Sequence, residues 1–213
     1  MDFNFAALSP ADRYKLLGSS VTPRPIAWVT TQSADGVRNA APFSFFNVMG
    51  HTPPLLALGL IRRPDGSLKD TTANILETGE FVVHLVNEAL AEAMNLTCID
   101  APGEYDEITM AGLDTLPSTV VTPPRLAPAP VAMECRKWQA IDAGSSTIIL
   151  GEVLHFHIAD TLIDGDKLHI DTIGLDLIAR MHNPGWYSRQ TDLFPMPRPL
   201  FEDWKAQNEP DKS

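Results

Sequence analysis

The sequence has few of the features that would place a protein in an oxidising compartment or a membrane. Among 213 residues there are two cysteines, Cys98 and Cys135, and no motif pairs them. We therefore expect no disulfide framework and two packed free thiols in a reducing cytoplasm. No apolar run approaches the roughly 18 residues of a membrane span. The N-terminus also lacks the basic start and apolar block of a secretory signal.

Positive charge is also scarce. The chain has 16 basic and 27 acidic residues, which gives a formal net charge of −11. An acidic surface repels polyanions, so the composition argues against nucleic acid or an anionic membrane as the main partner.

Several motifs that carry familiar chemistry are missing from the sequence. There is no G-x-G-x-x-G, no P-loop, no G-x-S-x-G and no zinc pattern, which weighs against a Rossmann dehydrogenase, a nucleotidase, a serine hydrolase and a zinc site. His155 and His157 alternate along one expected strand without an acidic or cysteine partner at ligand spacing. A polar outer face is therefore favoured there over a metal pair.

What the chain does have is 44% hydrophobic residues with 18 prolines and 13 glycines spread along it. Frequent turns between short apolar runs predict a mainly β fold, a barrel with a few helices. We expect one domain over residues 1–192 and a tail over 193–213 that packs at most on a partner subunit. Strands are predicted at 26–31, 37–48, 55–61, 81–86, 131–141 and 147–158, and helices at 10–18, 67–78, 88–96 and 171–181.

The stretch 21–49 is the most informative part of the sequence. Residues 26–31 are β-branched and aromatic and follow two prolines, so they predict a strand. Turn residues 33–36 then lead into a second extended run. This run contains small residues and Pro42, which cannot donate to a ladder, so it predicts an irregular edge strand or a place where a flat ligand lies against the backbone.

The stretch 67–79 predicts a helix whose start could hold an anion. Ser67 with Asp70 three residues later is typical of a capping box, and Gly79 suits the helix end. A helix start carrying Lys69 and hydroxyl groups offers the donors that bind phosphate. An ordinary capped surface helix is the alternative.

Four segments in order resemble the flavin reductase-like family of FMN-binding split barrels, the group that contains flavoredoxin. They are PRPIAWVTT at 23–31, NAAPFSFF at 39–46, KDTTANI at 69–75 and GEFVVHLV at 79–86. The later segments MEC at 133–135, ILGEVLHFH at 149–157 and RM…WY at 180–187 extend the resemblance over roughly residues 10 to 190.

The resemblance implies a six-stranded Greek-key split barrel, a homodimer, and one FMN per subunit near the dimer interface. It also implies that NADH or NADPH is the usual electron donor and that the flavin supplies the chemistry, so no side chain is nominated as a catalytic acid or base. Carried over by position, it implies that FMN is bound by Arg24, Thr30, Thr31, Asn39, Ala40, Ala41, Pro42, Ser44, Ser67, Lys69, Asp70, Thr71 and Thr72.

Two positions depart from the family pattern. His84 stands where relatives often have asparagine, and Met-His-Asn-Pro-Gly at 181–185 replaces the more usual Met-Gly-Gly. The second departure lies beside Arg180, Trp186 and Tyr187. This corner either shapes the nicotinamide or substrate side of the site or packs against a second subunit.

Three functions are compatible with the sequence. The first is an NAD(P)H-dependent flavin reductase that passes electrons to an acceptor, with a partner monooxygenase as one candidate. The second is a flavoredoxin-like carrier that is reduced by another protein. The third is a protein that binds flavin without turnover.

Overall fold

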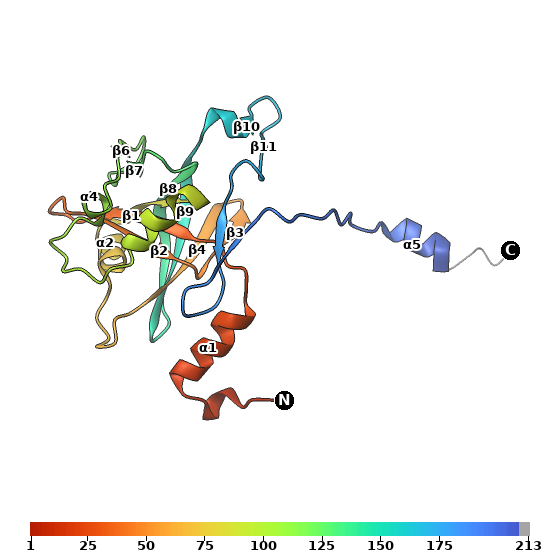
Figure 1. Cartoon of the computed structure of the whole chain (residues 1–213), viewed down its shortest axis with the longest axis horizontal. Coiled ribbons are helices and arrows are strands. Elements are labelled where there is room, and N and C mark those ends of the chain that lie inside the picture. The colour runs from red at the N-terminus through yellow and green to blue at the C-terminus, as the bar shows by residue number, and fades with distance from the viewer. Residues whose placement is uncertain (209–213) are drawn as a thin grey trace.

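One seven-stranded antiparallel sheet forms the body of the protein (Figure 1). The structure, a computed structural model, describes residues 1–208. Across the sheet the strands follow the order β2-β1-β5-β8-β9-β4-β3. Their bounds are Ala27–Gln32 for β1, Arg38–Phe43 for β2, Phe46–His51 for β3, Pro54–Ile61 for β4, Glu80–His84 for β5, Val131–Asp142 for β8 and Ser146–Ile158 for β9.

The two edge strands of this sheet are consecutive in sequence. The predicted extended run over 37–48 is broken at Ser44 and Phe45 into β2 and β3, which lie at opposite edges. Only these two residues separate β2 from β3, so the chain itself connects the two edges, and the Gly59 N–H of β4 continues the β3–β4 pairing to the Phe45 carbonyl at 2.7 Å. The sheet thereby closes into a barrel. The split of one run also explains why there are seven strands and not the expected six.

The small hairpins and all the helices except the last lie around the barrel (Figure 1). None of the helices within residues 1–208 is long and apolar enough to cross a membrane. The helices are α1 (Pro10–Ser20), α2 (Asp70–Thr78), α3 (Ala91–Leu96), α4 (Glu107–Met110) and α5 (Phe201–Asn208), with 3₁₀ turns at Phe5–Ala7, Glu88–Leu90 and Asp160–Leu162. The hairpins pair β6 (Thr115–Leu116) with β7 (Arg125–Leu126), β10 (Ile163–Asp164) with β11 (His169–Ile170), and β12 (Ile178–Arg180) with β13 (Tyr187–Arg189).

The barrel interior is filled by alternate side chains of β1, β4, β5, β8 and β9. Phe81 of β5 is fully buried, and its ring lies against the backbone of Gly151 on β9. A Cβ atom at position 151 would clash with that ring, so only glycine permits this approach. Cys135 is buried in the same core, whereas Cys98 is exposed, so the expectation of a packed thiol is wrong for Cys98.

The longest predicted strands are confirmed, but two helix boundaries are corrected and one predicted helix is absent. Ser67 does not cap α2. Lys69 takes the N-cap position without a side-chain hydrogen bond, and the Ser67 N–H donates to Asp65 Oδ1 at 2.9 Å in the preceding turn. Gly18 does not end α1. The Arg24 guanidinium donates to the Gly18 and Val21 carbonyls at 2.5 and 2.9 Å and lets the helix continue to Ser20.

The helix predicted over 171–181 is absent. The Asp171 side chain instead accepts the Gly174 N–H at 2.8 Å in a turn, and residues 178–180 pair with β13. The local hydrogen bond offers the backbone an alternative to a helix.

Residues 191–208 form an arm that extends away from the barrel (Figure 1). Residues 191–200 have no regular structure and lead to α5. The arm leaves large apolar side chains in solvent, with 75% of Phe194 and 68% of Phe201 exposed. The last residues of the predicted tail, 209–213, lie outside the described part of the chain.

A buried carboxylate joins β8 to β9 and to the loop before β7. Glu134 is fully buried, and its Oε1 lies 2.6 Å from His157 Nε2. The backbone N–H groups of Thr119 and Val120 donate to Oε1 and Oε2 at 2.7 and 2.6 Å. The expectation of a polar outer face is therefore wrong for His157, which faces a buried partner that lies 23 residues away in the sequence.

Candidate functional site

Three cavities meet at the end of β2, where Pro42 and Phe43 line all of them. Their volumes are about 510, 230 and 250 Å³, and we refer to them as the first, second and third cavity. Ser44 also lines the first and third, and Lys69 the second and third. The predicted ligand-binding segment 39–44 is thus the wall that separates neighbouring hollows.

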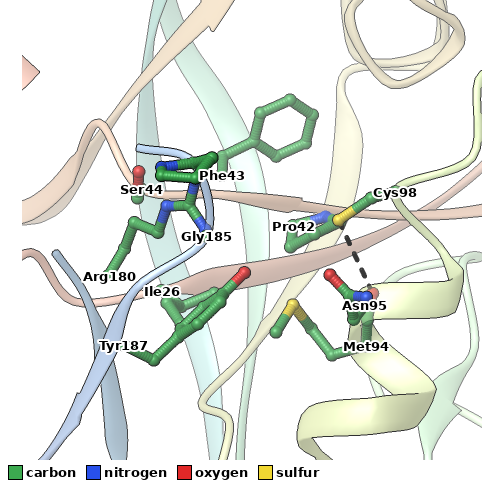
Figure 2. A pocket seen from close by; sticks show the side chains of 11 residues that line it. Ile26, Pro42, Phe43, Ser44, Met94, Asn95, Cys98, Arg180, Gly185 and Tyr187 are labelled. Carbon is green, nitrogen blue, oxygen red and sulfur yellow. Dashed lines mark hydrogen bonds between the residues drawn. The ribbon is translucent and has the colours of Figure 1, made fainter. Parts of the chain in front are cut away.

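The first cavity lies between the end of β2, helix α3 and the hairpin of β12 and β13 (Figure 2). In Figure 2, Arg180 and Tyr187 project from one side and face Met94, Asn95 and Cys98 on the other. The Arg180 guanidinium lies 4.9 Å from the Tyr187 ring centroid and donates to Asn183 Oδ1 at 2.9 Å. Among the described residues it has no carboxylate partner, so the wall of the first cavity carries one free cation.

The second cavity lies beside the start of α2 and holds most of the charged groups of the site. Arg63 is neutralised within the chain by Asp70 at 2.9 Å and by Asp100 at 3.7 Å. Lys69 forms no ion pair with any residue in the range 1–208. It is therefore the cation of this cavity that remains available to a ligand.

The first turn of α2 also faces this cavity, through Asp70 and Thr71. Its first intrahelical bond runs from the Ala73 N–H to the Lys69 carbonyl at 3.0 Å, and no side chain caps the helix. The N–H groups of the first turn are therefore free of intrahelical partners. Unused N–H groups at a positive helix end next to a lysine form an anion-binding arrangement.

A buried polar network holds this helix start against β1 and β2. Asn39 Oδ1 accepts hydrogen bonds from Thr71 Oγ1 at 2.6 Å and from Thr31 Oγ1 at 3.1 Å. Asn74 Nδ2 donates to Thr31 Oγ1 at 3.0 Å, and Asn39 Nδ2 donates to Glu107 Oε2 at 3.0 Å. Buried polar groups that satisfy one another fix a single arrangement of their elements.

The match to known families decides which class of protein carries these cavities. A model described as a flavin reductase like domain matches residues 18–172, which include every strand of the barrel. The chain belongs to the flavin reductase-like family. The fold is accordingly a split barrel, and it is shared with a protein of Shewanella frigidimarina that has a split barrel domain (TM-score 0.80, 20% identity, covering 93% of this chain and 100% of that one).

Other known proteins are more similar to this chain in sequence. An uncharacterized protein of Deinococcus radiodurans is 42% identical, with 99% of this chain and 97% of that protein covered. Nitrilotriacetate monooxygenase component B from Bacillus cereus is 35% identical with a TM-score of 0.88, covering 92% of this chain and 98% of that one. The 2-nitrobenzoate 2-nitroreductase NbaA of Pseudomonas fluorescens is also 35% identical, with a TM-score of 0.86 and coverage of 94% and 98%.

The structure brings together seven of the residues that the resemblance to the flavin reductase-like family implied. They line the cavities at the end of β2 and are Asn39, Ala41, Pro42, Ser44, Lys69, Asp70 and Thr71.

The six other predicted residues line none of these three cavities. Thr30 and Thr31 are fully buried. The Thr30 hydroxyl donates to the Pro124 carbonyl at 2.6 Å, and the Thr31 hydroxyl donates to Asn39 Oδ1. The Arg24 guanidinium donates hydrogen bonds to backbone carbonyls and to Ser44 Oγ at 3.3 Å. It therefore holds Ser44 in place without lining a cavity itself. Ala40 and Thr72 are buried in the protein, and Ser67 is exposed.

Many residues that line the cavities were not among the predicted cofactor-binding residues, and four of them carry ionisable groups of interest. Arg63, Cys98 and Glu107 line the second cavity, and Arg180 lines the first. The sequence signal for Arg180 was its place in the segment RM…WY. No local pattern distinguishes the other three, because they reach the site from loops and a short helix that are far from residues 39–44 in the sequence.

Proposed function

We propose that the protein is an FMN-dependent oxidoreductase of the NAD(P)H:flavin reductase type. The observation that carries the proposal is the junction of the first and second cavities at Pro42 and Phe43. A hollow of about 510 Å³, lined by apolar and aromatic side chains together with polar ones, adjoins one that contains the free cation Lys69 and the open helix start. A flat apolar ring with an anionic tail is the ligand shape that such a pair of cavities accepts.

The residues present fit FMN. The backbone and small side chains of Ala41 and Pro42 would lie against the ring, and Ser44 would offer a hydroxyl at its edge. Lys69 and the first-turn N–H groups of α2 would hold the phosphate. These local donors must outweigh the overall charge of −11, and each charge-assisted hydrogen bond contributes about 1.5–3 kcal/mol.

Bound FMN would supply the redox chemistry by accepting a hydride from NAD(P)H at N5 and passing the electrons to an acceptor. The chain's own task is to position the two ligands and to exclude water. Arg180 and Tyr187 stand across the first cavity from α3, where they would contact whatever lies over the ring. We nominate no side chain as an acid or base.

We expect the purified protein to be yellow and to bleach when it is mixed anaerobically with NADH or NADPH. Stopped-flow absorbance at the flavin bands, with each nicotinamide in turn, measures this. A yellow protein that neither nicotinamide reduces would favour the flavoredoxin-like carrier. Reduction without transfer to any added acceptor would favour a flavin-binding protein without turnover.

A specific observation favours an aromatic acid as a second kind of acceptor. Arg180 is a cation without a carboxylate partner among the described residues, and the cavity that it lines also presents the aromatic rings of Phe43 and Tyr187. NbaA, at 35% identity, is a nitroreductase of 2-nitrobenzoate, whereas the similarly related component B belongs to a monooxygenase. Reoxidation of the bleached protein by 2-nitrobenzoate and by free FMN, each in a separate anaerobic mix, compares the two roles.

We further propose that the protein is a homodimer in which the arm, residues 191–208, packs on the second copy. The arm exposes Phe194, Phe201 and Trp204, and burial of such side chains would stabilise association. About ten extended residues and a two-turn helix reach roughly 40 Å, enough to cross a second domain of this size.

The arm gives a direct test of this assembly. In sedimentation velocity we expect the full chain to run as a dimer, and the combined Phe201→Ser and Trp204→Ser substitution to shift it towards monomer. Because both residues lie outside the barrel, its far-UV spectrum should not change. A full chain that is monomeric at micromolar concentration, or a variant that dimerises equally well, would contradict the proposal.

A further inference from the structure

The carboxylate of Glu107 lies on the wall of the second cavity with its two oxygens in different surroundings. The residue is only 5% exposed. Its Oε2 accepts hydrogen bonds from Asn39 Nδ2 at 3.0 Å and from the Ala40 N–H at 3.2 Å. Within the described chain, no residue donates a hydrogen bond to the second oxygen, Oε1. A carboxylate oxygen on a cavity wall that has no donor within the described chain is open to a donor on a ligand.

The charges around Glu107 leave it without a cation of its own. Arg38, which precedes Asn39, is paired with Asp106 at 2.5 Å, and Arg63 is paired with Asp70 and Asp100. Lys69 borders the same cavity but makes no ion pair within residues 1–208. Burial raises the pKa of Glu107 above its ordinary range, and the nearby Asp70 carboxylate adds to the effect. A hydrogen bond from a ligand would therefore stabilise the charged carboxylate, because it replaces the hydration that the group loses on burial.

These two features divide the second cavity into parts with opposite preferences. A phosphate is favoured at Lys69 and the start of α2, and it would be repelled by a carboxylate. A hydroxyl group is favoured at Glu107, because it can donate to Oε1. A ligand that satisfies both parts carries an anionic end and a chain of hydroxyls, as a phosphorylated polyol does.

We propose that Glu107 recognises the ribityl chain of the flavin by accepting a hydrogen bond from one of its hydroxyls, while Lys69 binds the phosphate. This inference rests on the proposed function, since it assumes that flavin occupies the site. Glu107 thereby becomes a specificity-determining residue that distinguishes ribityl flavins from flavins without a hydroxylated chain.

Three flavins separate the contributions in an equilibrium titration of the full-length apoprotein. Lumiflavin has the ring alone, riboflavin adds the hydroxyls, and FMN adds the phosphate. For the natural protein we expect riboflavin to bind about tenfold more tightly than lumiflavin, which corresponds to one hydrogen bond to a charged group. This measurement needs no substitution and so does not depend on any variant folding.

The variant that tests Glu107 itself is Glu107→Gln. Its amide oxygen must take over the bonds from Asn39 and Ala40, so its NH₂ replaces Oε1 at the cavity wall. We expect riboflavin and FMN to bind about tenfold more weakly and lumiflavin to bind unchanged. Lys69→Ala should weaken FMN by about 10- to 100-fold and leave riboflavin unchanged. Glu77→Gln, at an exposed position near the end of α2, is the matched control and should change nothing.

The outcomes distinguish failure of the inference from failure of the proposed function. Equal affinity of the natural protein for riboflavin and lumiflavin, or a Glu107→Gln variant that weakens either all three flavins or none, would overturn the role of Glu107 while flavin binding stands. Absence of binding by all three flavins to the natural protein would overturn both.

Discussion

Replacing Glu134 with alanine is expected to lower the free energy of unfolding by about 3–5 kcal/mol. The substitution leaves the Thr119 and Val120 N–H groups without an acceptor, and it removes the partner of His157. The carboxylate itself is fully buried, and the alanine side chain offers no acceptor in its place. Urea unfolding of the apoprotein at pH 7 and a fixed protein concentration measures the loss.

The state of Glu134 follows from two opposing effects. Burial alone would raise the pKa of this carboxyl, but the N–H donors of Thr119 and Val120, followed by His157, outweigh burial and hold the pKa below its ordinary value. The group is therefore a carboxylate at neutral pH. Since a carboxylate only accepts, His157 must donate through Nε2.

Glu80→Ala is the matched control for this prediction. Glu80 also accepts a backbone N–H from the same loop, that of Thr122 at 2.8 Å, but this bond is exposed to solvent. We expect its loss to cost about 1 kcal/mol or less. If the two variants lose the same free energy of unfolding, burial is not the reason that the Glu134 hydrogen bonds stabilise the protein.

The sequence predicts the barrel well because its strands carry strong local signals. Residues 131–141 and 147–158 are long β-type runs around an Asp-Ala-Gly-Ser turn, and β8 and β9 occupy them almost residue for residue. Helix starts are harder to predict, since they depend on single side-chain contacts. Ser67 matched a capping pattern, but Asp65 lies two residues before it and captures its N–H.

The site is predictable only where its residues are contiguous in sequence. Residues 39–44 and 69–71 reach the cavities as short segments whose composition already suggested a ligand. Glu107 and Arg63 reach the same cavity only through the fold. The two groups that donate hydrogen bonds to Glu107 lie 67 and 68 residues away in the sequence. Thr30 and Thr31 were predicted to bind the cofactor, but their hydroxyls bond within the protein. The local sequence of a strand does not show which neighbouring group a hydroxyl will bond to.

His84, the family departure on β5, illustrates how a polar residue becomes part of a core. It is fully buried, with Nδ1 at 2.9 Å from the Trp28 carbonyl and Nε2 at 3.0 Å from the Leu126 N–H. Since a carbonyl only accepts, Nδ1 carries the proton and Nε2 accepts. The ring is therefore neutral and joins β1 and β5 to β7.

We expect the free energy of unfolding to fall by about 3 kcal/mol, through His84 alone, as the pH decreases from 6.5 to about 4. Burial lowers the pKa of His84 from 6.5 to about 4, and the charges of Arg125 and His157 act in the same direction. Between pH 6.5 and about 4, His84 therefore binds a proton in the unfolded chain but not in the folded chain. The contribution is complete above pH 6.5 and is lost as the pH falls towards 4.

The difference between the natural protein and His84→Asn isolates this effect from every other titrating group. Asparagine can still donate to the Trp28 carbonyl but has no ring nitrogen to protonate, so the variant is less stable at pH 7 and less dependent on pH. Urea unfolding of both apoproteins at pH 4.5, 5.5, 6.5 and 7.5 should show a stability gap that narrows as the pH falls. His169→Asn, at an exposed position, should keep the natural slope. A gap between the natural protein and His84→Asn that stays constant from pH 7.5 to 4.5 would show that His84 is protonated as easily in the folded chain as in the unfolded one.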